Sequence, residues 1–150
     1  MKALDTLLQE KMMTLVRANS QSEGQALADA LVEAGVKVIE ITLTTPGALK
    51  IIANLLKHKG LLVGAGTVRT VKDVKKVEDI GAKFIVSPDT NEDVIAATKK
   101  LKLISMPGIS TPTEDAIAEK KLKEEHNLET VVTFFCDEGE KYMKDYWLKF

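Results

Sequence analysis

The sequence predicts an α/β fold in which a parallel sheet of about six strands has helices on both faces. Short apolar runs alternate with amphipathic segments of roughly 10 to 14 residues, as in consecutive βα units. This unit recurs about every 20 to 28 residues, with no linker between units. The apolar runs, which we expect to form strands, lie at residues 12–18, 37–43, 61–67, 82–88, 102–108 and 130–137. We expect these units to form a single α/β domain over residues 1–150.

Local signals mark where the helices between these runs begin and end. Ser20 and Glu23 have the spacing of a capping box at a helix start. Thr45 precedes a proline, and this pair also predicts a helix start. Gly35 and Gly81 stand where the helices before them should end. These signals support the division of the chain into βα units.

Six units are fewer than the eight that close a (β/α)8 barrel, which typically uses about 250 residues. The chain must therefore form an open sheet, part of a barrel, or a barrel that a second chain completes. An isolated half-barrel would expose an apolar inner face, which favours aggregation. We therefore favour an open, doubly wound, Rossmann-like sheet, with a partial (β/α)8 barrel as the alternative.

Composition and charge exclude several classes of function. Hydrophobic residues make up 45% of the chain and charged residues 29%, which is typical of a globular protein. The net charge is −1 with both signs interleaved, so no basic surface for nucleic acid or membranes is expected. The single cysteine, Cys136, and the two histidines, His58 and His126, lack metal-ligand spacing. We expect a cytoplasmic protein without a metal, and a homo-oligomer is left open.

A carboxylate in the middle of a predicted strand is the strongest sign of function. Alternation places Val38, Glu40 and Thr42 on one face of this strand, away from the isoleucines that face helices. A buried carboxylate needs a partner, or it takes up a proton with a raised pKa. Arg17, at the end of the preceding strand, could reach it. Glu40 is therefore paired with Arg17, hydrated, or part of a functional site.

The run Gly64-Ala65-Gly66-Thr67 stands at the end of a predicted strand and allows two interpretations. Its backbone amides could approach an anion closely, or its small residues could form a tight turn. The run lacks the third glycine of a dinucleotide-binding loop, so a nicotinamide cofactor is not expected.

The motifs LVRANS, VIEITLTTPGAL, GAGTV, FIVSP and MPGISTPTE occur in that order along the chain. In this order and spacing they resemble the 2-keto-3-deoxy-6-phosphogluconate (KDPG/KHG) aldolase family over residues 1 to about 114. The resemblance implies a class I aldolase, which is a lyase built on a (β/α)8 barrel. Such an enzyme cleaves a keto-deoxy sugar acid phosphate to pyruvate and glyceraldehyde 3-phosphate through a lysine Schiff base.

The resemblance also implies roles for individual residues. Glu40 matches the family's general acid/base, and Thr67 matches a residue that contacts the carboxylate of pyruvate. Arg17 matches a substrate-binding arginine on the first strand. Gly64 and Gly66 join this predicted substrate-binding set on separate grounds, because their backbone amides could approach an anion closely. The expected ligand is therefore a pyruvate-like carboxylate or a phosphate.

Departures from the family pattern bear on activity. Thr44 stands where many members carry a further arginine, which puts phosphate or carboxylate affinity at that point in doubt. Thr133 occupies the position of the Schiff-base lysine, and a threonine hydroxyl cannot form an imine. Lys83 and Lys102 lie at the starts of predicted strands, which is the wrong end of the sheet for a substitute amine.

From about Gly108 onward, the chain is similar to the closing segment of the cysteine synthase family, whose members use pyridoxal phosphate. Asp137 and Glu138 fall near the position where that family contacts the pyridine nitrogen of the cofactor. The family's cofactor-binding lysine has no counterpart here, so no cofactor is expected. We therefore interpret the chain as a chimera, in which an aldolase half-barrel (1–114) continues into an appended helix–strand–helix unit (115–150).

Three functions compete on these grounds. Our main interpretation is a chimeric or truncated scaffold that is catalytically inactive because of Thr133. The first alternative is a KDPG/KHG-type aldolase with residual activity. The second is a module that binds small carboxylates or phosphates through Arg17 and Thr67, without turnover.

Overall fold

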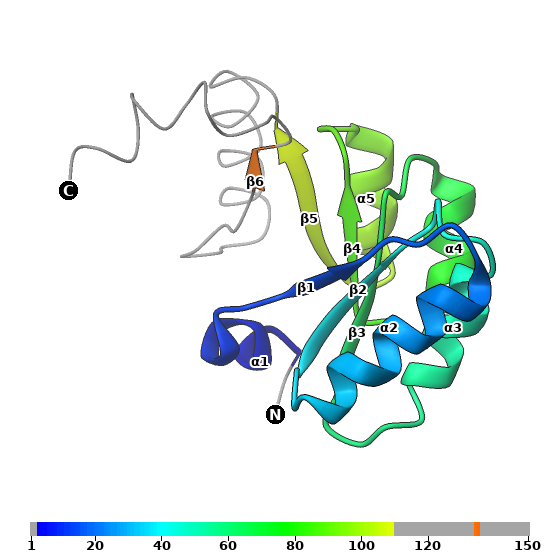
Figure 1. Cartoon of the computed structure of the whole chain (residues 1–150). Coiled ribbons are helices and arrows are strands. Elements are labelled where there is room, and N and C mark those ends of the chain that lie inside the picture. The colour runs from blue at the N-terminus through cyan, green and yellow to red at the C-terminus, as the bar shows by residue number, and fades with distance from the viewer. Residues whose placement is uncertain (1–2, 110–133, 136–150) are drawn as a thin grey trace, which may run out of the picture.

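The structure is a computed structural model that describes residues 3–109 and 134–135 (Figure 1). In chain order, the elements are α1 (Ala3–Glu10), β1 (Thr14–Val16), α2 (Gln21–Glu33), β2 (Val38–Thr42), α3 (Ala48–Leu55), β3 (Leu62–Gly66), α4 (Val71–Asp79), β4 (Phe84–Ser87), α5 (Glu92–Lys100), β5 (Ile104–Ile109) and β6 (Phe134–Phe135). All the predicted strands are present, and β1 to β5 are each shorter than the apolar runs that predicted them. The appended unit predicted over residues 115–150 lies outside the described residues, apart from β6.

The strands form one parallel sheet in the order β1-β2-β3-β4-β5-β6. Leu15 of β1 pairs with Glu40 of β2, and Glu40 pairs in turn with Gly64 of β3. Strands β4 to β6 continue the sheet with the same parallel pairing. The prediction of an α/β fold with a parallel sheet is therefore confirmed.

The strand order corrects our preference for a doubly wound sheet. In a doubly wound sheet the strand order reverses at a switch point, so that helices cover both faces. Here each strand lies beside the next one in the chain, which is the order of a (β/α)8 barrel wall. Helices α2 to α5 lie on one side of the sheet and α1 on the other (Figure 1). Right-handed crossovers between successive neighbours place all their helices on one side, so the described strands form part of a barrel wall.

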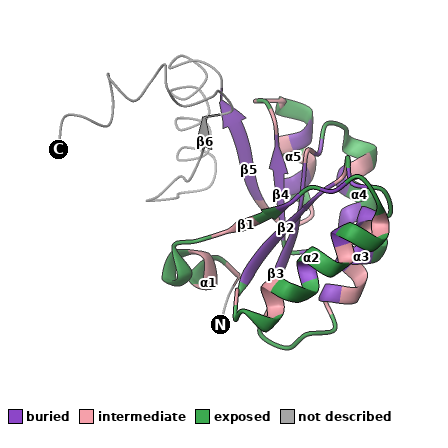
Figure 2. Ribbon diagram, viewed as in Figure 1, coloured by how far each residue is buried: buried purple, intermediate pink, exposed green. Residues whose placement is uncertain are grey.

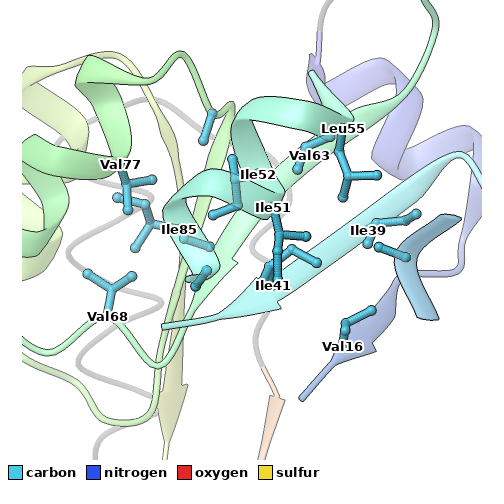
Figure 3. Close-up of a cluster of buried hydrophobic side chains, with 14 of the residues drawn as sticks. Val16, Ile39, Ile41, Ile51, Ile52, Leu55, Val63, Val68, Val77 and Ile85 are labelled. Carbon is cyan, nitrogen blue, oxygen red and sulfur yellow. The ribbon is translucent and has the colours of Figure 1, made fainter. Parts of the chain in front are cut away.

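The main core lies between the sheet and helices α2 to α5 (Figure 3). Ile39 and Ile41 of β2 pack in this core with Ile51, Ile52 and Leu55 of α3. All five side chains are fully buried, and burial of each contributes on the order of 2 kcal/mol to stability. The two isoleucines thus face the helices, as alternation along the strand predicted.

A smaller apolar cluster covers the opposite face of the sheet, which we call the inner face. Its buried members come from β2 to β5 and are Val38, Leu62, Phe84, Val86 and Met106. Ala3 and Leu7 of α1 pack against this cluster. Figure 2 shows β2 to β5 almost entirely buried, whereas β1 at the sheet edge is only partly covered. Leu15 of β1 keeps 51% of its surface exposed.

Several helix ends agree with the local sequence signals. The Ser20 hydroxyl accepts a hydrogen bond of 3.2 Å from the Glu23 amide at the start of α2. Gly35 follows α2 with a φ of +83°, and Gly81 follows α4 with a φ of +92°. Such left-handed conformations end helices and favour glycine.

The predicted start of α3 is wrong by two residues. The helix begins at Ala48 rather than directly after Thr45, and Gly47, with a φ of +71°, precedes it. The Thr45 hydroxyl does not cap the helix because it accepts a hydrogen bond from the amide of Ala18 instead. A tertiary contact has replaced the local one. None of the described helices is long and apolar enough to cross a membrane.

Candidate functional site

The carboxyl ends of parallel strands meet at one edge of the sheet, which is where α/β proteins bind ligands. Three neighbouring strands bring most of the predicted site residues to this edge. These residues are Arg17 directly after β1, Glu40 within β2, Thr44 after β2, Gly64 and Gly66 within β3, and Thr67 directly after β3. The fold therefore gathers residues that are up to 50 positions apart in the sequence, from Arg17 to Thr67.

Glu40 is buried in the middle of β2, with only 2% of its surface exposed. Burial raises the pKa of its carboxyl group to about 7, although the nearby charge of Arg17 acts in the opposite direction. At neutral pH the group therefore exists in both protonation states, as a general acid/base requires.

Arg17 is exposed at the end of β1 and influences Glu40 without pairing with it. No ion pair joins Arg17 to Glu40 in the described part of the chain, where Lys75–Glu78, Lys75–Asp79 and Lys76–Asp73 form ion pairs on α4. The interpretation of Arg17 and Glu40 as an ion pair is therefore wrong. The guanidinium group of Arg17 is exposed at the edge where a ligand would bind.

Gly64 and Gly66 lie inside strand β3, so they do not form a tight turn. A Cβ atom on Gly66 would overlap the carboxyl group of Glu40, and one on Gly64 would overlap the ring of Phe84. Neither glycine has a positive φ. Both glycines therefore make room for side chains from the neighbouring strands.

Thr67, the first residue after β3, has a φ of +57°. This left-handed conformation is rare for a β-branched residue and costs of order 1–3 kcal/mol. Strain of this kind is concentrated at ligand-binding sites, where the surrounding structure enforces it. It occurs here at the residue that we predict to contact a ligand carboxylate.

Thr42 at the end of β2, with Thr44 and Thr45 just after it, forms a threonine cluster that holds the end of β1 in place. The Thr42 hydroxyl donates a hydrogen bond of 3.3 Å to the carbonyl oxygen of Val16. The Thr45 hydroxyl accepts one of 3.2 Å from the amide of Ala18 and lies 3.1 Å from the Thr42 hydroxyl. The exposed Thr44 donates to Thr42 over 3.2 Å. This threonine cluster therefore fixes the backbone on both sides of residue 17.

Sequence reasoning missed two residues at this edge. We interpreted Thr45 as a helix cap, because its true partner lies 27 residues earlier in the chain. Arg69 is exposed in the loop after β3 and is, with Arg17, one of only two arginines in the chain. Its place directly after the GAGTV motif was the available signal.

No lysine lies within the described strands. Lys83 and Lys102 precede β4 and β5 and line a cleft of about 390 Å³ at the opposite edge of the sheet. Their predicted position at the wrong end is therefore confirmed. Burial lowers the pKa of Lys99, but this residue stands in the last turn of α5, on the far side of the sheet from Glu40.

Other predicted residues fall outside the site or outside the described part of the chain. His58 is exposed after α3. Among residues 3–109 and 134–135, no group of three or more His, Cys, Asp or Glu side chains could hold a metal ion. The remaining predictions, on Thr133, Cys136, His126, Asp137 and Glu138, concern residues that the structure does not describe.

Fold and site together define a class of protein. Sequential parallel strands with their crossover helices on one side indicate a barrel-type α/β fold, and a buried carboxyl group with a pKa of about 7 indicates a proton-transfer site. The family model for KDPG and KHG aldolases matches residues 4–124, so the chain belongs to that aldolase family. The match extends beyond residue 114, where we expected the aldolase part to end.

Known members of the family agree with this assignment. A probable 2-dehydro-3-deoxy-6-phosphogalactonate aldolase of Rhizobium meliloti is 33% identical over 109 residues, which cover 71% of this chain and 51% of the relative. The structure of the 2-keto-3-deoxy-6-phosphogluconate aldolase of Zymomonas mobilis with 3-phosphoglycerate has a TM-score of 0.62 at 29% identity, covering 72% of this chain and 51% of that one. The KDPG aldolase of Legionella pneumophila, with pyruvate captured as a covalent carbinolamine intermediate, has a TM-score of 0.62 at 26% identity, covering 91% and 75%. The chain spans about half the length of the curated relatives it matches.

Proposed function

We propose that this chain acts as a lyase on keto-deoxy sugar acids and releases pyruvate, in the manner of the KDPG and KHG aldolases. The observation that carries the proposal is Glu40, a buried carboxyl group with a pKa of about 7. The motif VIEITLTTPGAL, through which the chain resembles the family, matches this residue to the family's general acid/base. Membership of the family over residues 4–124 supports it.

Each site residue has a role in this proposal. Glu40 moves a proton between substrate and water, because both of its protonation states are populated near neutral pH. Arg17 and Thr67 hold the carboxylate of the keto acid at the strand ends. The 3-phosphoglycerate and pyruvate bound by two of the structural relatives support a ligand with carboxylate or phosphate groups.

The Schiff-base amine is the open requirement of this chemistry. Thr133 stands at the predicted lysine position, and no described strand carries a lysine. In this proposal the amine therefore comes from a lysine beyond residue 109, in this chain or in a second copy of it. The candidates are Lys120, Lys121, Lys123, Lys141, Lys144 and Lys149.

Borohydride trapping with pyruvate tests the proposal directly. Intact-protein mass should show one pyruvate-derived adduct, and peptide mapping should place it on a lysine beyond residue 109. The variants Lys83→Arg and Lys102→Arg serve as controls and should keep the adduct, because both residues lie at the opposite edge. Absence of an adduct, with the KHG/KDPG aldolase of Escherichia coli labelled in parallel, would overturn the aldolase proposal.

A second candidate function is binding of small carboxylates or phosphates without turnover. The exposed Arg17 at the ligand edge favours it, because its guanidinium group has no ion-pair partner among the described residues. Titration with pyruvate and with inorganic phosphate, followed by amide NMR shifts, would distinguish this function from our main interpretation of a chimeric, inactive scaffold. Changes in the amide shifts of Arg17 and Thr67 without a covalent adduct would support the binding module. The absence of such changes at millimolar ligand would support the inactive scaffold.

A further inference from the structure

We propose that Gly66 is a positioning residue for Glu40, because its missing side chain leaves a slot on β3 that holds the Glu40 carboxyl group against the inner face of the sheet. The role of this slot in catalysis rests on the proposed function. The existence of the slot is inferred from the geometry of β2 and β3 alone.

The register of the two strands places Glu40 over this slot. Glu40 pairs with Gly64, and Gly66 is the next residue of β3 that faces the same side of the sheet. The Glu40 side chain leans along the strand toward Gly66. A Cβ atom added there would overlap Oε1 and Cδ of Glu40 and lie 3.0 Å from its Cγ. No side chain larger than that of glycine fits while Glu40 keeps this position.

The backbone of β3 does not itself require glycine at this point. Gly66 has no positive φ, unlike Gly35 and Gly81, whose conformations favour glycine. Glycine inside a strand weakens it, because it has no side chain to pack and loses more backbone freedom on folding. The physical reason for glycine at position 66 is therefore the carboxyl group that lies across it.

The slot also explains why Glu40 is protonated so readily. Its walls on β3 are Gly64 and Gly66, which offer no charge, and α1 contributes Ala3 and Leu7 to the apolar cluster of the same face. Among the described residues, Arg17 is the charged group that acts on the Glu40 carboxyl group. Holding the carboxyl group on β3 keeps it buried and out of ion-pair contact with Arg17, so its proton affinity stays high.

The first test measures the pKa of Glu40 by carboxyl carbon NMR in the full chain. In Gly66→Ala, the displaced carboxyl group should become more hydrated, and its pKa should fall by at least about one unit, a tenfold loss of proton affinity. The matched control is Ala65→Gly, which weakens the same strand but changes the opposite face. An unchanged pKa in Gly66→Ala would overturn the proposal.

The second test asks whether Glu40 is the reason for the glycine. Gly66→Ala should lower the Tm by about 5 °C or more in the wild-type background. In the Glu40→Ala background the same change should leave the Tm equal or higher, because the overlapping group is gone. If Gly66→Ala alone does not fold but folds together with Glu40→Ala, the slot is supported. Equal losses in both backgrounds would show that the backbone needs the glycine, and would refute the slot.

Neither readout depends on catalysis. Absence of a pyruvate adduct would overturn the aldolase proposal and leave these results unaffected. Conversely, an adduct combined with an unchanged Glu40 pKa in Gly66→Ala would keep the aldolase and remove the slot. The two proposals can therefore fail separately.

Discussion

At the scale of single residues, the buried carboxyl group of Glu40 couples folding to pH. Its pKa is about 7 in the folded protein, against an ordinary value of 4.5. Between these values the folded protein holds a proton that the unfolded chain has released. The stabilising contribution is therefore complete below pH 4.5 and is lost as the pH rises through 7.

We expect the free energy of unfolding to fall by about 2 to 3 kcal/mol between about pH 5 and about pH 8 on account of this one group. Glu40→Gln should remove this part of the pH dependence, because glutamine has the same shape but does not titrate. Urea unfolding of both proteins at the two pH values measures the difference. The same pH dependence in both proteins would show that Glu40 is not buried in the way we describe.

Arg17 is the second residue whose charge can be tested. Because its positive charge lowers the pKa of Glu40, Arg17→Leu should raise that pKa further. The same change should weaken pyruvate binding about fivefold, as expected for loss of one exposed charge contact worth roughly 1 kcal/mol. Arg17→Lys, which keeps the charge, should change both values less. An NMR titration gives the pKa and the affinity together, and a lowered Glu40 pKa in Arg17→Leu would contradict the structure.

At the scale of elements, the threonine cluster connects β2 to the end of β1. Thr42 binds the carbonyl oxygen of Val16, and Thr45 binds the amide of Ala18. The intervening residue is Arg17, so the backbone that carries the guanidinium group is held from both sides. The cluster therefore couples the stability of the sheet edge to the geometry of the ligand site.

Thr45→Val should destabilise the protein by about 1 to 3 kcal/mol, because it leaves the amide of the buried Ala18 without its acceptor. Thr44→Val is the matched control, since Thr44 is exposed and only donates to Thr42. Its effect should stay within about 0.5 kcal/mol. Chemical denaturation compares the two variants, and equal effects would mean that the bond to Ala18 contributes little.

For the individual elements, the sequence correctly predicted those features that depend on residues close by in the chain. Ser20 and Gly81 mark helix ends correctly because a cap and a left-handed residue act within one helical turn. Thr45 was misinterpreted because its partner is 27 residues away. The sequence predicted a ligand contact at Gly66, and this stays a prediction, but it did not predict that a side chain of another strand lies across this glycine. Local signals carry no information on such contacts.

At the scale of the whole molecule, alternation fixed the faces of the strands but not their order. Ile39 and Ile41 face helices in a doubly wound sheet and in a barrel alike, so the pattern of β2 cannot separate the two. The order β1 to β6 depends on which strands meet across the crossover helices. The choice between open sheet and barrel wall therefore needed the structure. The aldolase part was predicted to end near residue 114, because the last recognisable motif ends there. The family model matches up to residue 124.

Curvature of the whole sheet decides whether an amine on β6 can work with Glu40 on β2. Three strands separate β6 from β2, which in a flat sheet amounts to about 19 Å, far beyond the reach of a lysine side chain. In a barrel wall the sheet curls, and residues of distant strands face each other across the interior. Thr133 directly precedes Phe134, the first described residue of β6.

We therefore expect Thr133→Lys to form an imine with pyruvate at neutral pH. Borohydride trapping should give a stoichiometric adduct at position 133, formed more slowly when Glu40→Gln is added, because the general acid/base is then missing. Ala30→Lys, on the exposed side of α2, is the control for a lysine placed elsewhere, and peptide mapping should find no adduct at position 30. Labelling of positions 30 and 133 to the same extent would reflect ordinary lysine reactivity. Labelling of neither position would mean that the sheet does not curl enough to bring β6 and β2 together, and that the aldolase geometry of the first strands does not extend across the molecule.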